Sequence, residues 1–198
     1  MIKFINLSPE IPYLIFKDKY NQALNNSQKN IEAISISSFS YSSNEVSSRF
    51  VNLKFINKKE FIFFSNYKSP KSKDFIEHNQ AALLIYWSNI NTQIRLKGVI
   101  KETSTEFNKK YFSNRSKEKN ALAISSKQSQ PIDSYESVKI NFKKSLHLDD
   151  LKECPDYWGG YSFTPYYFEF WEGHESRINR RIVFDKIDGS WKESYLQP

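Results

Sequence analysis

Residues 157–181, YWGGYSFTPYYFEFWEGHESRINRR, predict a long aromatic strand that is followed by a basic turn. Nine aromatic residues lie between Tyr157 and Trp171, and alternate residues of a strand point to opposite faces of its sheet. Three guanidinium groups then follow within five residues: Arg177, Arg180 and Arg181. A flat apolar strand that ends in clustered cations suits a ligand with a ring and a phosphate. The same pattern also describes a core strand followed by a solvated turn, because strand aromatics usually pack in the interior.

Parity assigns the side chains of this strand to two faces. One face receives Tyr161, Phe163, Tyr167 and Glu169, and the other receives Tyr166, Phe168 and Phe170. Just before them, Gly159 and Gly160 predict a sharp turn where the strand begins.

Length and composition indicate one globular domain over residues 1–198, in which aromatic residues make up 16%. The single Cys154 excludes an intrachain disulfide, and three scattered histidines indicate no metal cluster. We expect a cytoplasmic protein without a membrane segment, because there is no signal-like N-terminus and no apolar run of about 18 residues. The net charge of +7 favours anionic ligands, but the lysines are spread along the chain, which argues against a nucleic-acid-binding protein.

The pattern of apolar residues predicts short strands with a few helices between them. Helices are expected at 11–24 (within an N-terminal helical segment, 1–30), 69–80, 105–113, 117–126 and 135–146. Strands are expected at 33–39, 46–56, 61–66, 81–87 (a central strand), 92–104 with a bulge at Gly98, 161–172, 180–184 and 190–195, the last two joined by an Asp188-Gly189 turn. The fold class is therefore mainly β with peripheral helices, as a closed or nearly closed antiparallel barrel.

Several basic residues fall near strand ends and helix starts. On one strand, Arg49 and Lys54 are five residues apart, so parity puts them on opposite faces unless a bulge intervenes. Lys71 lies in a first helical turn, where a cation and free N–H groups can bind phosphate, or where it is simply solvated. Tyr111 and Arg115 share a helix face, either as a phosphate-binding pair or as a packing pair. Motifs for Rossmann and P-loop nucleotide binding, for metalloproteases and for serine hydrolases are absent.

Nine segments in one order, with the terminal LQP, resemble the pyridoxamine 5′-phosphate oxidase family of FMN-dependent proteins, from about Pro9 to Pro198. The segments are RFVNLK (49–54), FFSN (63–66), PK (70–71), TQIRLKG (92–98), YFSNR (111–115), SKQSQPI (126–132), YWGGYSFTP (157–165), FEFWEG (168–173) and RINRR (177–181). The SKQSQPI loop together with the C-terminal motifs makes the resemblance specific.

The resemblance implies an FMN-binding antiparallel split β-barrel. The protein would be a homodimer with FMN at the interface and residues 157–198 as dimerisation and active-site strands. Positions that match FMN-binding residues are Arg49, Phe50, Val51, Lys54, Phe64, Ser65, Lys71, Gln93, Gln128, Ser129, Trp171 and Arg181. Positions that match substrate-binding residues are Lys54, Tyr111, Arg115, Lys119, Arg177 and Asn179, the last two also catalytic.

The implied activity is oxidation of pyridoxine or pyridoxamine 5′-phosphate to pyridoxal 5′-phosphate, a step in vitamin B6 metabolism, with O₂ as the acceptor. One alternative is a related flavin oxidase, resembling the phenazine-biosynthesis enzymes, that acts on a reduced aromatic acid. Another is a non-catalytic protein that binds FMN or pyridoxal phosphate.

Several positions depart from the family pattern. Pro70 stands where the family has an arginine, Lys119 replaces a serine, Asn179 replaces a histidine and Arg180 replaces an acid. The segment NALAIS (120–125) replaces a glycine-containing one, and no Arg-x-x-Tyr motif precedes Pro9. Most of these changes fall on the substrate side, so the resemblance supports FMN binding more directly than it supports a particular substrate.

Overall fold

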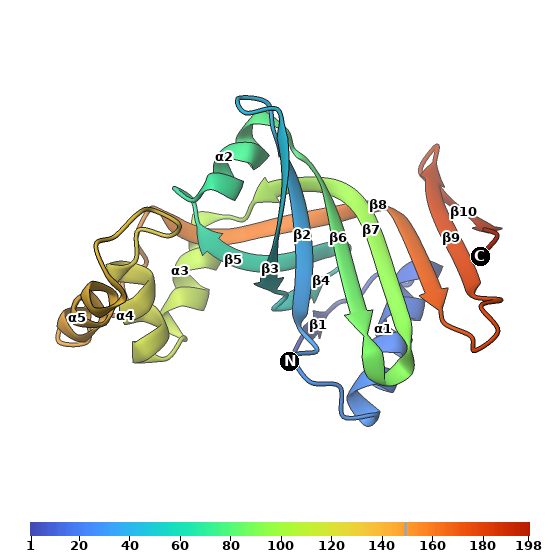
Figure 1. The fold of residues 1–198 in the computed structure, drawn as a ribbon, viewed down its shortest axis with the longest axis horizontal. Coiled ribbons are helices and arrows are strands. Elements are labelled where there is room, and N and C mark those ends of the chain that lie inside the picture. Colours follow the sequence, from blue (N-terminus) through green and yellow to red (C-terminus); the bar gives the residue numbers. More distant parts are fainter. Residues whose placement is uncertain (149) are drawn as a thin grey trace.

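The computed structural model describes residues 1–148 and 150–198 as one ten-stranded sheet with helices around it (Figure 1). The strands are β1 (Lys3–Ile5), β2 (Ala33–Ser40), β3 (Glu45–Asn52), β4 (Phe55–Asn57), β5 (Glu60–Asn66), β6 (Gln80–Trp87), β7 (Thr92–Glu102), β8 (Trp158–Glu172), β9 (Arg180–Ile187) and β10 (Ser190–Tyr195). The α-helices are α1 (Ile11–Asn25), α2 (Pro70–Glu77), α3 (Thr105–Ser113), α4 (Lys117–Ser125) and α5 (Tyr135–Ser145), and a 3₁₀ turn covers Ser88–Ile90.

The strand order is β1-β4-β5-β8-β7-β6-β2-β3, which confirms a mainly β split-barrel fold. Two details differ from the expected antiparallel, nearly closed barrel. The β1–β4 pair is parallel, and the pairings among the described residues do not close the sheet. Along one edge of β8, the first half pairs with β5 and the second half with β9, so this strand runs across the whole molecule (Figure 1).

A bulge in β8 explains how one long strand fills the core. Opposite Lys97 and Gly98 of β7 lie Tyr167 and Pro165, so Tyr166 is the extra residue. The bulge expected at Gly98 is confirmed, but the parity assignment is wrong beyond it. The inserted residue reverses the alternation, and side chains from both sides of the bulge are buried in the same core: Tyr161, Phe163, Phe168 and Phe170.

Helix α1 closes one end of the core with an aromatic stripe. Its buried residues include Tyr13, Phe16, Tyr20 and Ala23, whose spacing of three and four places them on one helix face. Phe16 packs edge to face against Phe61 of β5, with ring centroids 5.0 Å apart. The helix therefore forms where its sequence predicts it.

The strand expected over 46–56 is divided in two. The backbone N–H of Leu53 donates to Glu32 and that of Lys54 donates to Ile62, so the chain leaves β3 and enters β4 along a different neighbour. This break removes the parity relation between Arg49 and Lys54. Strand β6 also differs from a continuous buried strand, because its side chains alternate and Leu84 and Tyr86 are 41% and 55% exposed.

The two glycines before the aromatic run do not form a turn. Gly159 and Gly160 lie inside β8, and neither has a positive φ. A Cβ at Gly159 would collide with Tyr67, so close packing requires the glycine. By contrast, the expected turn between β9 and β10 is confirmed, with φ of 49° at Asp188 and 81° at Gly189, as in a type I′ hairpin.

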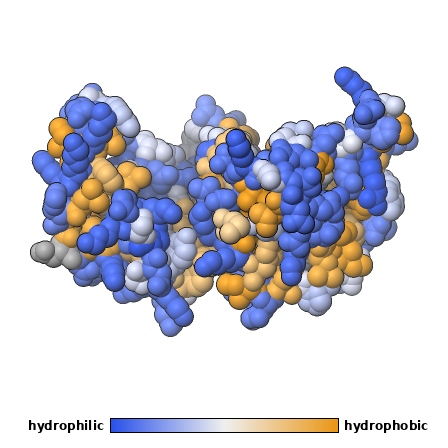
Figure 2. Space-filling model, turned by 90° about the horizontal axis from the view of Figure 1, so that it is seen from below, coloured by the Kyte–Doolittle hydropathy of each residue, from blue (hydrophilic) through white to orange (hydrophobic). Residues whose placement is uncertain are grey.

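Hydrophilic side chains interrupt the apolar areas on the face that Figure 2 shows. None of the described helices combines the length and apolar character that a membrane span requires.

Candidate functional site

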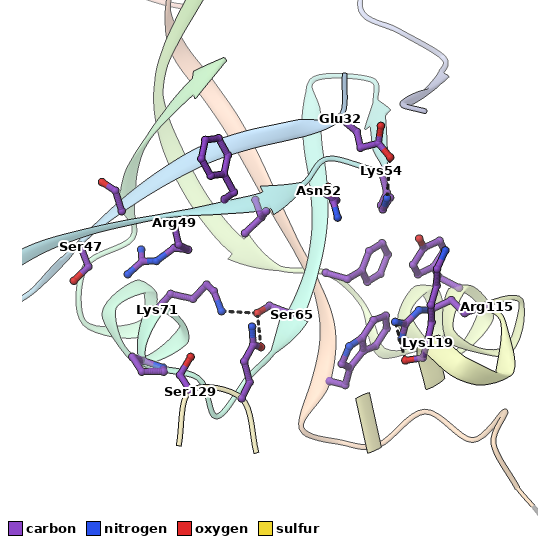
Figure 3. Close-up of a pocket in the computed structure, with 18 residues that line it drawn as sticks. Glu32, Ser47, Arg49, Asn52, Lys54, Ser65, Lys71, Arg115, Lys119 and Ser129 are labelled. Atoms are coloured by element: carbon purple, nitrogen blue, oxygen red, sulfur yellow. Dashed lines mark hydrogen bonds and ion pairs between the residues drawn. The ribbon is translucent and has the colours of Figure 1, made fainter. Parts of the chain in front are cut away.

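A cavity of about 900 Å³ opens between β3, β5, α2 and α3 and the loop after α4 (Figure 3). It contains most of the residues that the sequence predicts for the site: Arg49, Phe50, Val51, Lys54, Phe64, Ser65, Lys71, Tyr111, Arg115, Lys119, Gln128 and Ser129. The break after β3 brings Arg49 and Lys54 to this one cavity, although simple parity separates them. The lining carries several cations and a single carboxylate, that of Glu32.

At one end of the cavity, Lys71 is a buried cation. Its Nζ donates to Ser65 Oγ at 2.8 Å and to Ser69 Oγ at 2.9 Å. Burial, together with the positive charge of Arg49, lowers the pKa of Lys71 to about 8. The interpretation of Lys71 as a solvated surface lysine is therefore wrong, and the ammonium group lacks a carboxylate partner within ion-pair distance among the described residues.

The loop that contains the SKQSQPI motif completes this end. Gln128 Oε1 accepts hydrogen bonds from Ser65 Oγ at 3.2 Å and from the backbone N–H of Asn66 at 3.1 Å. The next residue, Ser129, has a φ of 64°, which turns the loop along the cavity. Two segments far apart in sequence thus surround one group of hydroxyls and cations.

At the other end, Arg115 follows α3 and is held against Trp158. Its guanidinium carbon lies 4.4 Å from the centroid of the Trp158 ring, and Nη2 donates to the carbonyl of Lys119 at 3.2 Å. The Nη1 atom is buried and has no hydrogen-bond partner among the described residues. Burial lowers the pKa of Arg115 and raises the pKa of Tyr111. An anionic oxygen would satisfy this orphaned donor.

Stacked aromatic rings lie between these two ends (Figure 3). The ring of Phe64 stacks on Tyr111 with centroids 3.9 Å apart and on Trp158 with centroids 5.1 Å apart. We did not predict Trp158, Glu32 or Asn52 as site residues, although all three line the cavity. The YWGGY motif was a signal for Trp158; no sequence pattern indicated Glu32.

The remaining predicted residues lie elsewhere: Gln93, Trp171, Arg177, Asn179 and Arg181. Trp171 pairs with both Gln93 and Arg181 at the far end of β8. From Trp158 to that end, the strand extends roughly 45 Å at about 3.3 Å per residue. Within one chain these residues do not reach the cavity.

The loop and strand start at the far end of β8 have their own local structure. Asn179 Oδ1 accepts from the backbone N–H of His174 at 3.0 Å, and Arg177 has a φ of 61°. Arg180 pairs with Glu172 at 3.0 Å. The strand part of the C-terminal stretch lies in the core, which is one of the two interpretations of its sequence. The loop after this strand is stabilised by its own polar contacts.

Comparison with known proteins gives matches over nearly the whole chain. Residues 18–149 match the model of the pyridoxamine 5′-phosphate oxidase family, and residues 158–198 match that of the pyridoxine 5′-phosphate oxidase C-terminal dimerisation region. The chain belongs to the pyridoxamine 5′-phosphate oxidase family. It is thus an FMN-dependent oxidoreductase, as the motifs indicated.

Individual relatives agree with membership of the pyridoxamine 5′-phosphate oxidase family. Pyridoxine/pyridoxamine 5′-phosphate oxidase 1 of Hydrogenovibrio crunogenus is 34% identical over 191 residues, covering 94% of this chain and 88% of that protein. Among solved structures, PhzG from Burkholderia lata, in complex with tetrahydrophenazine-1-carboxylic acid, has a TM-score of 0.90 and 25% identity, covering 96% of this chain and 94% of the other. An FMN-binding protein from Nostoc punctiforme shares the fold, with a TM-score of 0.77 and 13% identity, covering 92% of this chain and 97% of that one.

Proposed function

We propose that this protein is a cytoplasmic, homodimeric FMN-dependent oxidase that converts pyridoxine or pyridoxamine 5′-phosphate to pyridoxal 5′-phosphate, with O₂ as the electron acceptor. The observation that carries the proposal is one cavity with a cationic group at each end and stacked aromatic rings between them. Two cationic ends suit two phosphates, one on the cofactor and one on the substrate.

The end built on α2 suits the FMN phosphate. Here Lys71 and Arg49 supply positive charge, while the hydroxyl of Ser129 supplies a donor. The amide of Gln128 holds the loop in place through Ser65. When bound, FMN supplies the two-electron oxidation, and the residues around it bind and orient it.

The end built on α3 suits the substrate phosphate. The buried Nη1 of Arg115 is an unsatisfied donor, and Tyr111 and Lys54 line the same region. A phosphate here would be partly shielded from water, which strengthens its hydrogen bonds to the guanidinium and phenol groups. Lys119 adds a further cation, which can compensate for a hydroxyl donor lost at this position.

The far end of β8 contributes to catalysis only if a second copy of the chain brings it to the cavity. In this proposal, Arg177 and Asn179 of one copy contact the substrate bound to the other, while Gln93, Trp171 and Arg181 contact FMN. Support comes from the match of residues 158–198 to a dimerisation region. Several apolar side chains on β3, β6 and β7 are exposed in the single chain, which suits a surface that a second copy covers: Val46, Phe50, Leu84, Tyr86 and Val99.

A second candidate is oxidation of a reduced aromatic carboxylic acid. The structure of PhzG was solved with such an acid, and its fold superposes closely on this chain. The cations Lys119 and Arg180, in place of a hydroxyl and an acid, suit a carboxylate as well as a phosphate.

The test is an absorbance spectrum of the purified protein, followed by peroxide release with pyridoxamine 5′-phosphate and with pyridoxine 5′-phosphate. Flavin absorbance bands with peroxide from either compound support the proposal. Flavin bands with peroxide only from a reduced aromatic acid favour the second candidate. Flavin bands without peroxide from any compound indicate a binding protein, and failure to take up added FMN contradicts the proposal altogether.

A further inference from the structure

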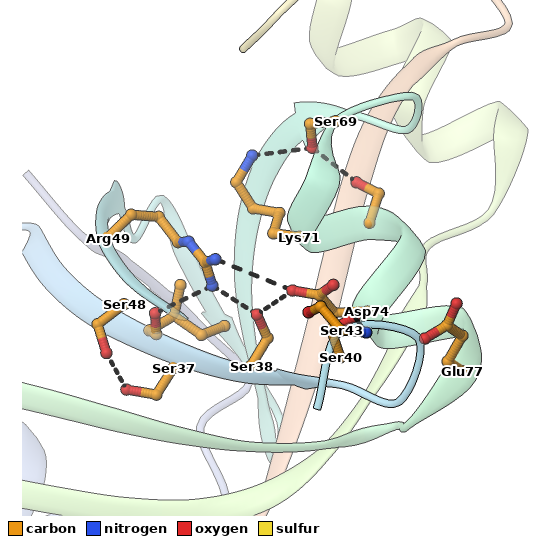
Figure 4. A network of polar contacts seen from close by, with 12 residues as sticks. Ser37, Ser38, Ser40, Ser43, Ser48, Arg49, Ser69, Lys71, Asp74 and Glu77 are labelled. Atoms are coloured by element: carbon orange, nitrogen blue, oxygen red, sulfur yellow. Dashed lines mark hydrogen bonds and ion pairs between the residues drawn. The ribbon is translucent and has the colours of Figure 1, made fainter. Parts of the chain in front are cut away.

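Behind the FMN-phosphate end of the cavity, a buried chain of polar contacts joins α2 to β2 and β3 (Figure 4). Asp74 is 8% exposed and does not line the cavity. Its Oδ2 accepts a hydrogen bond of 2.6 Å from Ser38 Oγ, and the same hydroxyl accepts one of 2.6 Å from Arg49 Nη1. Asp74 Oδ2 is also 3.9 Å from Arg49 Nη2. Arg49 does line the cavity, and two of its guanidinium nitrogens contact Ser38 and Asp74, which do not line it.

These buried contacts fix the orientation of the Arg49 side chain. An arginine side chain has many rotamers, and fixing it in one of them costs conformational entropy. Contacts to Ser38 and Asp74 fix Arg49 before any ligand arrives, so the ligand does not have to order it. Ser38 is only 2% exposed, which shields these polar contacts from competing water.

We propose that Asp74, acting through Ser38, is a positioning residue that orients the Arg49 guanidinium for the phosphate of FMN. This inference rests on the proposed function and adds to it a residue outside the cavity lining. The two possible roles of Asp74 predict opposite effects of its neutralisation on FMN affinity. If Asp74 acted only as a negative charge near an anion, its neutralisation would tighten phosphate binding. As a positioning residue, its neutralisation weakens binding, because Arg49 loses its orientation.

The experiment measures FMN affinity by quenching of flavin fluorescence in the wild type and in Ser38→Ala and Asp74→Asn. Each variant is expected to bind FMN about tenfold more weakly, the size of one charge-assisted hydrogen bond. Riboflavin, which lacks the phosphate, should bind all three proteins equally. Ser38→Ala leaves every charge in place, so it tests orientation alone and remains informative if Asp74→Asn folds poorly.

The matched control is Glu77→Gln on the same helix. Glu77 accepts hydrogen bonds from the backbone N–H groups of Tyr41 and Ser42 in the β2–β3 turn, and it forms no hydrogen bond or ion pair with Arg49. The FMN affinity of Glu77→Gln should equal that of the wild type. In an Arg49→Met background, Asp74→Asn should cause little further loss, because the residue it positions is gone.

Three results would overturn the inference. Tighter or unchanged FMN binding by Asp74→Asn would show that the carboxylate acts as a charge or not at all. An equal loss of riboflavin affinity would indicate general damage to the cavity. A full additional loss in the Arg49→Met background would mean that Asp74 acts on another group. A wild type that binds no FMN is a different result, because it refutes the proposed function itself.

Discussion

The guanidinium of Arg181 and the carboxylate of Glu169 are joined by two hydrogen bonds, at 2.9 Å from Nε and 2.7 Å from Nη2. The third nitrogen, Nη1, donates to the carbonyl of Gln197 at 2.9 Å. Glu169 is 1% exposed and also accepts from Arg95 and Tyr167. In this chain Arg181 therefore anchors the C-terminal segment to β8.

This anchor predicts a large effect of Glu169→Gln on stability. The change leaves Arg181 and Arg95 without a buried anionic partner, and we expect a loss of about 3 kcal/mol in the free energy of unfolding. Thermal or urea unfolding measures it. Glu172→Gln is the control, because the Glu172 side chain is 31% exposed against 1% for Glu169, so its pairs with Lys19 and Arg180 should contribute less than about 1 kcal/mol. Equal losses in the two variants would contradict a special role for Glu169.

The lowered pKa of Lys71 predicts that FMN binding depends on pH. Burial, reinforced by Arg49, brings the pKa of Lys71 to about 8. A bound phosphate dianion favours the protonated lysine, so above pH 8 binding must take up a proton and the affinity should fall by up to about tenfold per pH unit. Below about pH 8 the affinity should be nearly constant as long as the phosphate remains a dianion. Fluorescence titrations between pH 7 and 9.5 measure the slope.

Two controls test the assignment of this slope to Lys71. In Lys71→Met the affinity is lower at all pH values, and the dependence above pH 8 should disappear. Riboflavin binding by the wild type should be flat over the same range. A slope that survives in Lys71→Met would assign the titration to another group.

The two ends of the cavity should be separable by mutation. Arg115→Met removes the orphaned buried donor at the substrate end, and we expect KM for pyridoxamine 5′-phosphate to rise by about 100-fold, the loss of a charged hydrogen-bond partner. The FMN affinity should change by less than about twofold, since Arg115 lies at the opposite end from Lys71 (Figure 3). Steady-state kinetics and flavin titration on one preparation measure both. Loss of FMN with KM unchanged would reverse the assignment of the ends.

Arg177 gives a test of the site shared between two copies. Arg177→Ala should abolish turnover and leave FMN bound, because we propose that this residue contacts the substrate and not the cofactor. Arg115→Met should be nearly inactive at low substrate concentration. If each site takes Arg177 from one copy and Arg115 from the other, mixed dimers contain one intact site, and an equal mixture recovers about a quarter of the wild-type activity.

The mixing experiment uses denaturation and refolding of the two variants together, with each variant refolded alone as the control. Recovery only in the mixture supports a shared site. If co-refolded dimers form and no activity returns, Arg177 and Arg115 act within the same chain or not in one site.

Much of this protein could be predicted from local sequence, because the signals are local in origin. The helical spacing in 11–24, the turn at Asp188-Gly189 and the bulge at Gly98 follow from backbone preferences and from the period of apolar residues. The order of short motifs predicted the family and the cofactor, and with them most residues of the cavity lining.

Tertiary structure decided which of these residues meet. Parity separates Arg49 from Lys54, and only the exchange of hydrogen-bond partners at Leu53 brings both to one cavity. A single inserted residue, Tyr166, puts both halves of β8 into the same core. Close packing against Tyr67, rather than a turn, requires Gly159. The buried contacts of Asp74 with Ser38 and of Glu169 with Arg95 join segments far apart in the chain, and pairing between distant segments leaves no periodic signal in either one.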